Sequence, residues 1–143
     1  MKNTLPAGTY VICDPCYVIR DSEWDRVLQE TEYFNYKSTD RGGVFTDSET
    51  GLEYAVFSTA YGDGLYVDNM GHKFPVDAGC IGCVPVGMCG AEAEGHLVVE
   101  RKTPFEVEYN NGTIIFGAIR IDTKGHSGGG YYEDQEEEEE EED

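Results

Sequence analysis

Residues 105–121 read F-E-V-E-Y-N-N-G-T-I-I-F-G-A-I-R-I, and the pattern within them decides the class of fold. From 105 to 109, aromatic or aliphatic side chains alternate with two glutamates, which is the period of a strand with one buried face. Asn110-Asn111-Gly112 is a hairpin turn signal, because Asn and Gly tolerate the backbone of tight turns. Residues Thr113–Ile121 are therefore expected to pair back as a second strand.

Further strands are expected on both sides of this hairpin, from runs of β-branched and aromatic residues bounded by turn signals. The predicted strands are Gly8–Asp14, Val44–Thr46, Glu53–Ala60, Leu65–Val67, Lys73–Val76, Cys80–Val86 and His96–Arg101, and residues 33–36 are also strand-like. The fold class is thus α+β and mainly β: a single antiparallel β-rich domain, barrel-like or sandwich-like.

One short helix is predicted after the first strand. Trp24, Val27 and Leu28 share one face at helical spacing, and Asp21 or Ser22 can cap the start. The helix should end near Thr31, before the strand-like residues.

The sequence divides into a globular domain over 1–121 and a C-terminal tail over 122–143. The tail is Gly-rich and then acidic, a composition that predicts disorder. The chain carries a net charge of −19, and ten of its 29 acidic residues lie between Glu133 and Asp143. The other 19 acidic residues are only partly balanced by the ten Lys and Arg, so the domain itself keeps a charge of about −9.

This charge argues against direct binding to nucleic acid or to an anionic membrane, and the few basic residues are scattered. No stretch has the length and hydropathy of a membrane span. The N-terminal residues contain no apolar secretory segment, so a cytoplasmic location is expected.

Two C-x-x-C pairs, Cys13/Cys16 and Cys80/Cys83, could form a tetrahedral zinc site. Sixty-three residues separate the pairs, however, and both pairs lie in apolar runs where buried cysteine is common. A thioredoxin-like role is disfavoured, because no helix opens at Cys13. The favoured interpretation is a turn in which Asp14 accepts a backbone N–H bond, Pro15 fixes φ, and Cys16 and Tyr17 enter the core.

Three aspartates beside glycine or proline, Asp14, Asp63 and Asp77, are the candidate catalytic residues, with Asp68 nearby in sequence. Together they could hold Mg²⁺ or supply an acid and a base. The alternative is that each aspartate braces its own turn through side-chain-to-backbone bonds. No cofactor is favoured, and magnesium or zinc are the alternatives.

The blocks G-T-Y-V-I-C-D-P-C-Y-V-I (8–19), T-A-Y-G-D-G-L-Y (59–66) and V-D-A-G-C-I-G (76–82) resemble a family of small, uncharacterised proteins of bacteriophages and bacteria. The resemblance includes Asp14, Tyr17, Asp63 and Asp77, but not Cys13, Cys80 or Cys83. It implies no catalytic assignment, and by analogy it implies an accessory factor that acts on a host protein.

The leading hypothesis is a non-enzymatic acidic binding protein whose partner is a basic host protein, possibly one that binds nucleic acid. Its binding residues would be Asp14, Tyr17, Tyr61, Asp63 and Asp77. Two alternatives remain open from the sequence: a divalent-metal-dependent hydrolase that uses the aspartates, and a structural zinc protein that uses the two C-x-x-C pairs.

Overall fold

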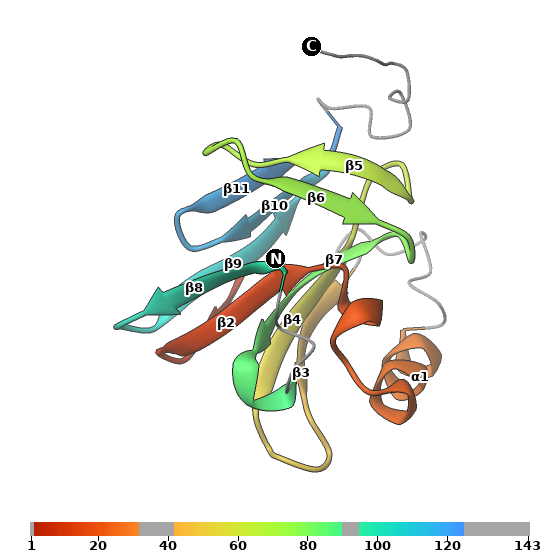
Figure 1. Ribbon diagram of the computed structural model, residues 1–143, viewed down its shortest axis with the longest axis vertical. Coiled ribbons are helices and arrows are strands. Elements are labelled where there is room, and N and C mark those ends of the chain that lie inside the picture. The colour runs from red at the N-terminus through yellow and green to blue at the C-terminus, as the bar shows by residue number, and fades with distance from the viewer. Residues whose placement is uncertain (1, 32–41, 90–94, 125–143) are drawn as a thin grey trace.

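Two antiparallel sheets, a separate β-hairpin and one α-helix make up the part of the chain that the structure describes (Figure 1). The computed structural model describes residues 2–31, 42–89 and 95–124. The expected β-rich α+β class is confirmed, in its sandwich-like form.

The larger sheet has five strands in the order β3-β4-β7-β2-β8, and every neighbouring pair is antiparallel. Its strands are β2 (Gly8–Cys13), β3 (Gly42–Thr46), β4 (Glu53–Ser58), β7 (Cys80–Pro85) and β8 (Leu97–Arg101). Short 3-10 turns follow two of them, η1 (Pro15–Tyr17) after β2 and η2 (Val86–Met88) after β7.

The smaller sheet has the order β1-β9-β10-β11. Its strands are β1 (Lys2–Leu5), β9 (Phe105–Asn110), β10 (Thr113–Phe116) and β11 (Ile119–Asp122). The hairpin of β5 (Gly64–Val67) and β6 (Lys73–Val76) forms a third unit. It is joined to the smaller sheet by an isolated bridge between Asp68 and Ile121.

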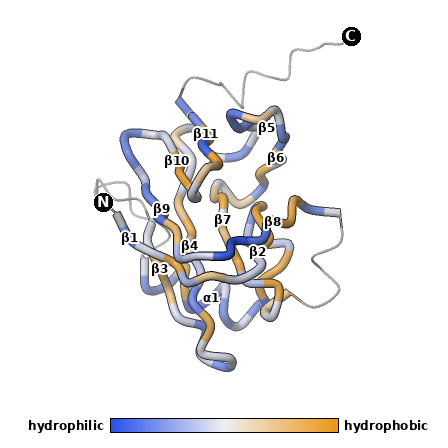
Figure 2. Tube along the Cα trace, turned by 90° about the vertical axis from the view of Figure 1, so that its left-hand side faces the viewer, coloured by the Kyte–Doolittle hydropathy of each residue, from blue (hydrophilic) through white to orange (hydrophobic). Residues whose placement is uncertain are grey.

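Strict alternation along the strands of the larger sheet produces two hydrophobic layers. In β2, Tyr10 and Ile12 enter the core shared with the smaller sheet and the hairpin, whereas Val11 and Cys13 enter a second core. That second core lies under α1 (Asp21–Glu30), whose Val27 is fully buried in it. Figure 2 shows hydrophobic residues along the central strands β4 and β7. The larger sheet is therefore covered on both faces.

A buried carboxylate fastens α1 to the larger sheet. Glu23 is 1% exposed and accepts hydrogen bonds from the Tyr54 hydroxyl and from the guanidinium of Arg26. The Ser48 hydroxyl lies 3.1 Å from the same carboxylate. Arg20 completes the arrangement with an ion pair at 2.7 Å to Asp47, a second buried carboxylate. The helix is thus held by charge-assisted contacts as well as by its apolar face.

Most predicted elements are present, with four corrections. The span Thr113–Ile121 is two strands, because Gly117 (φ +64°) reverses the chain between β10 and β11. Strand β1 was not expected. The α1 N-cap is Arg20, so neither Asp21 nor Ser22 caps the helix. The folded part also extends past 121, since Thr123 is fully buried and donates a hydrogen bond to the Gly112 carbonyl at 2.5 Å.

The strand-like residues 33–36 and the predicted tail from 125 onward lie outside the described residues. Among the residues that are described, no helix combines the length and the hydropathy needed to span a membrane.

Replacing Gly42 by alanine is expected to lower the free energy of unfolding by at least about 2 kcal/mol. A Cβ atom there would lie 2.1 Å from the Val56 carbonyl oxygen and 2.7 Å from the Phe57 Cα, both rigid backbone atoms of β4. Urea denaturation measures the loss. Gly8→Ala is the matched control, since Gly8 has a similar φ (+159° against +150°) but its Cβ would meet nothing closer than the Tyr10 ring at 3.5 Å. Equal losses in the two variants would refute the steric explanation.

Candidate functional site

Asp14 is the centre of the candidate site, and it is fully buried. Its Oδ1 accepts the backbone N–H of Cys16 at 3.0 Å, which closes the turn predicted from the D-P-C sequence. Its Oδ2 accepts two further backbone N–H groups, from Asp77 at 2.6 Å and from Ala78 at 2.7 Å. The carboxylate therefore joins the end of β2 to the turn between β6 and β7, and its oxygens face main-chain amides.

The two glycine–aspartate turns lie side by side. The Thr59 N–H donates to the Gly79 carbonyl at 2.9 Å, and the Thr59 hydroxyl donates to the Gly62 carbonyl at 2.6 Å. The Tyr66 hydroxyl also donates to Gly62, at 2.9 Å. Both turns adopt the left-handed backbone that glycine favours, at Gly62 (φ +80°) and Gly79 (φ +78°).

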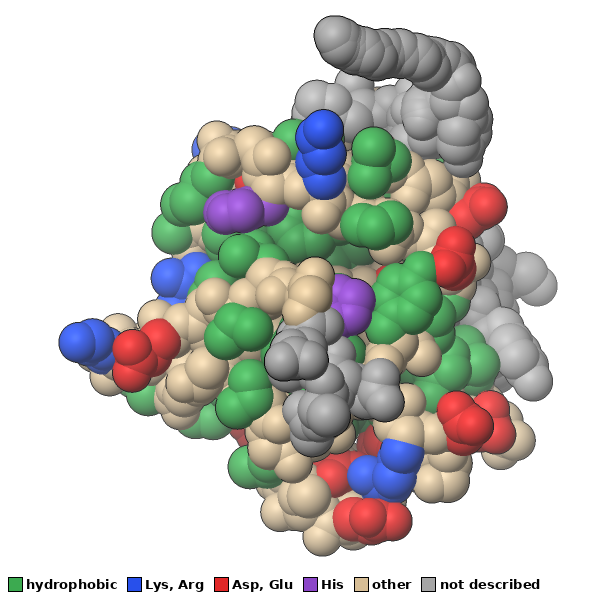
Figure 3. Space-filling view, in the orientation of Figure 1, with side chains coloured by type: hydrophobic (Ala, Val, Ile, Leu, Met, Phe, Trp, Pro, Cys, Tyr) green, Lys and Arg blue, Asp and Glu red, His purple; other side chains and the backbone are tan. Residues whose placement is uncertain are grey.

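The register of the β5–β6 hairpin brings two exposed aspartates to the same end. Gly64 and Val76 form the last pair there, and Asp63 and Asp77 are the next residues on the two strands. Both are exposed, as is Tyr61, which is 55% exposed. Neither aspartate has an ion-pair partner in the described part of the chain. We call Tyr17, Tyr61, Asp63 and Asp77 the acidic turn surface. Figure 3 shows acidic side chains at several separate places on one face of the molecule.

The sequence predicts Cys16 and Tyr17 in the core, but both are half-buried, and Tyr17 packs against the second core. Its hydroxyl donates a short hydrogen bond to Oδ2 of Asp77. That bond, followed by burial, raises the pKa of Tyr17 above its usual value, so the phenol stays protonated and keeps donating at neutral pH. Asp77 is thereby held through its backbone by Asp14 and through its side chain by Tyr17.

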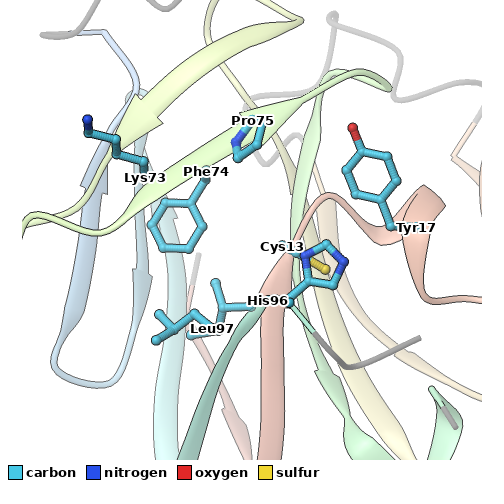
Figure 4. A pocket seen from close by; sticks show the side chains of 9 residues that line it. Cys13, Tyr17, Lys73, Phe74, Pro75, His96 and Leu97 are labelled. Atoms are coloured by element: carbon cyan, nitrogen blue, oxygen red, sulfur yellow. The ribbon is translucent and has the colours of Figure 1, made fainter. Parts of the chain in front are cut away.

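A residue that the sequence did not single out, His96, stacks on Tyr17. The two ring centroids are 5.7 Å apart and the planes differ by 12°. Both rings line a cavity of about 150 Å³ between the end of β2, the strand β6 and the start of β8 (Figure 4). No local motif could have revealed this pair, because 78 residues separate the two rings along the chain.

The four cysteines of the C-x-x-C pairs are not gathered around one point. Cys80 and Cys83 are three positions apart on β7, so their side chains enter opposite cores. Cys13 lies with Cys80, while Cys83 lies on the other face of the sheet. Burial raises the pKa of the Cys13 and Cys83 thiols, and burial with the neighbouring Asp14 carboxylate raises that of Cys16 to about 12. All described cysteines are free thiols, and these groups are poor metal ligands when protonated.

The aspartates also do not form one carboxylate cluster. Asp68 lies at the opposite end of the β5–β6 hairpin, where it accepts the N–H groups of Met70 and His72 at 2.9 and 2.8 Å and pairs with the His72 ring at 2.7 Å. Within residues 2–31, 42–89 and 95–124, no three His, Cys, Asp or Glu side chains are arranged to hold a metal ion. Asp14 and Asp68 brace turns through backbone N–H groups, whereas Asp63 and Asp77 are exposed directly beyond the last pair of the β5–β6 hairpin.

Searches against protein-family models, curated proteins and solved structures found no match to this chain. The resemblance to small phage and bacterial proteins therefore stays a prediction.

Proposed function

We propose that the protein is a non-enzymatic binding protein that recruits a basic protein partner through the acidic turn surface. The observation that carries this proposal is the position of Asp63 and Asp77, both exposed, directly beyond the last residue pair of the β5–β6 hairpin, where neither has an ion-pair partner among the described residues. Like charges placed across from each other destabilise a hairpin, and a bound cation from a partner would relieve that repulsion.

The rigid support of this surface favours binding. The backbone of Asp77 is held by buried Asp14, and its side chain is held by Tyr17. The Gly62 turn, which leads into Asp63, is held by Thr59 and Tyr66. Carboxylates that are already positioned lose little conformational entropy on binding, so charge-assisted bonds to Arg or Lys keep more of their energy.

The net charge of −19 acts at longer range, because it attracts basic surfaces and speeds encounter with them. A nucleic-acid-binding protein is a suitable partner class, since its binding surface is built to accept phosphate charges. An accessory protein of the phage or bacterial type that the sequence resembles would act in this way, in the cytoplasm.

Affinity capture from a cell lysate at two salt concentrations tests this function. We expect basic proteins to bind the wild-type chain at about 50 mM salt and to be released at about 500 mM, because salt screens exposed charges. The variant Asp63→Asn/Asp77→Asn should lose those proteins. The matched control Asp25→Asn/Glu53→Gln removes two exposed charges elsewhere and should retain them. A chain truncated after Lys124 separates the contribution of the acidic C-terminal segment.

The proposal fails if the captured set is the same for the Asp63/Asp77 variant and for wild type. It also fails if no basic protein is enriched at low salt, with or without residues 125–143.

A further inference from the structure

A cavity lies beside Tyr17, and the proposed role of the acidic turn surface makes no use of it. It lies between β6 and the start of β8, and its volume is about 150 Å³. Figure 4 shows the rings of Tyr17 and His96 on one side and the side chains of Phe74 and Leu97 on the other. The lining includes Ile12, Tyr17, Phe74, Pro75, His96 and Leu97.

The walls of the cavity suit an aliphatic stem. Ile12 and Phe74 are 1% and 2% exposed and form part of the main core. Pro75 and Leu97 add further apolar surface. Methylene groups that enter such a space are removed from water, which stabilises the complex by roughly 25 cal/mol for each Å² of apolar surface buried.

The Tyr17 side of the cavity is aromatic, and Asp77, which is not itself a lining residue, contributes a carboxylate next to the Tyr17 hydroxyl. The Tyr17 hydroxyl binds Oδ2 of Asp77, while Oδ1 of Asp77 has no partner among the described residues. The stacked rings of Tyr17 and His96, whose planes differ by 12°, supply ring surface on which a flat cation can lie. The one basic side chain of the lining, Lys73, is exposed, and its ammonium group points away from the cavity in Figure 4.

An arginine side chain matches these features better than other side chains do. Its stem is apolar, and its guanidinium is planar, so it can stack on a ring while it donates two hydrogen bonds to a carboxylate. Lysine has the stem and the charge, but not the flat head or the paired donors. An acidic side chain would be repelled by Asp77, and a purely apolar one would remove water from that carboxylate without compensation.

We infer that this cavity receives an arginine side chain of the basic partner, with the guanidinium against Tyr17 and Asp77. The inference rests on the proposed function and makes it more specific. The protein would then select partners by a particular arginine as well as by positive charge.

Two labelled peptides of equal length and charge, one with arginines and one with lysines, test the inference by fluorescence anisotropy at low salt. Wild-type protein should bind the arginine peptide about fivefold more tightly. Tyr17→Leu should abolish the preference, and Tyr17→Phe, which keeps the ring but loses the bond to Asp77, should reduce it. Tyr61→Leu is the matched control, because Tyr61 does not line the cavity, and it should keep the preference.

The outcomes separate the two proposals. Equal binding of both peptides that still depends on Asp63 and Asp77 would overturn the arginine cavity and leave the proposed function intact. No binding of either peptide would count against both. Should Tyr17→Leu fail to fold, the NMR signals of the His96 ring in the wild-type protein decide: they should shift with the arginine peptide and not with the lysine peptide, and equal shifts would overturn the inference.

Discussion

Asp14→Asn is expected to lower the free energy of unfolding by about 2 to 3 kcal/mol, although the two side chains have nearly the same shape. The buried carboxylate accepts three backbone N–H groups, from Cys16, Asp77 and Ala78, and no water can replace it. An amide has only one oxygen, so at least one of these donors must face an NH₂ group. The charge that strengthens all three bonds is also lost.

The same substitution should weaken binding of the arginine peptide even under conditions where the variant is folded. The turn at 77–79 loses its attachment to β2, so Asp77 is no longer held in place for a partner. Urea denaturation and anisotropy measure the two effects. Asp63→Asn is the control for stability: Asp63 is exposed and should change the unfolding free energy by less than about 0.5 kcal/mol while still weakening binding. An Asp14→Asn protein as stable as wild type would contradict the bracing role of Asp14.

Glu23→Gln is expected to be similarly destabilising, by about 2 to 3 kcal/mol, because it removes the charge from a buried ion pair. Arg26 and the Tyr54 hydroxyl would keep their positions but lose the anion to which they donate. The Arg26 side chain is 33% exposed, so water still solvates part of its charge, and this limits the loss of unfolding free energy. Glu30→Gln is the matched control, since Glu30 also pairs with Arg26 at 2.5 Å but is 51% exposed, and its loss should stay under about 0.5 kcal/mol.

The contribution of Glu23 to the free energy of unfolding should also depend on pH, in a defined direction. Burial alone would raise the pKa of Glu23, but the bonds from Arg26, Tyr54 and Ser48 outweigh it and hold the pKa below the usual 4.5. The ionised carboxylate therefore stabilises the fold fully above pH 4.5, and this contribution is lost as the pH falls through the lowered value.

The stability difference between wild type and Glu23→Gln should accordingly be largest near neutral pH and shrink on acidification. Measuring the difference, rather than the wild-type curve alone, removes the change in overall repulsion that a strongly acidic chain undergoes. A difference that stayed constant down to pH 3 would contradict the role of the ionised form.

Much of the local structure could be predicted from the sequence. The alternation at 105–109 and the turn at 110–112 predict the β9–β10 hairpin, and Trp24, Val27 and Leu28 predict the buried face of α1. The prediction was less accurate where a strand was short or ended in a turn with weak signals. The sequence predicts a continuous strand across the β10–β11 turn at Gly117-Ala118, since the residues on both sides are β-branched or aromatic.

The candidate site could be predicted only in part. The turn that Asp14 closes on Cys16 follows from residues two positions apart. The bonds from the same carboxylate to Asp77 and Ala78 join residues 63 and 64 positions apart, and no local pattern indicates them. His96 was not recognised for the same reason, as its contact with Tyr17 requires β8 to pair beside β2.

By itself, then, the sequence determined the elements, because strand periodicity, helix faces and tight turns depend on residues only a few positions apart. The tertiary structure alone decided which aspartates are brought near one another, which are buried and which are exposed to solvent. Strand order and register fix those outcomes, since they bring segments some sixty residues apart into contact, as they do for Tyr17 and Asp77. The same arrangement placed Cys13 and Cys80 in one core and Cys83 in the other, on opposite faces of the larger sheet, and left Asp63 and Asp77 facing solvent.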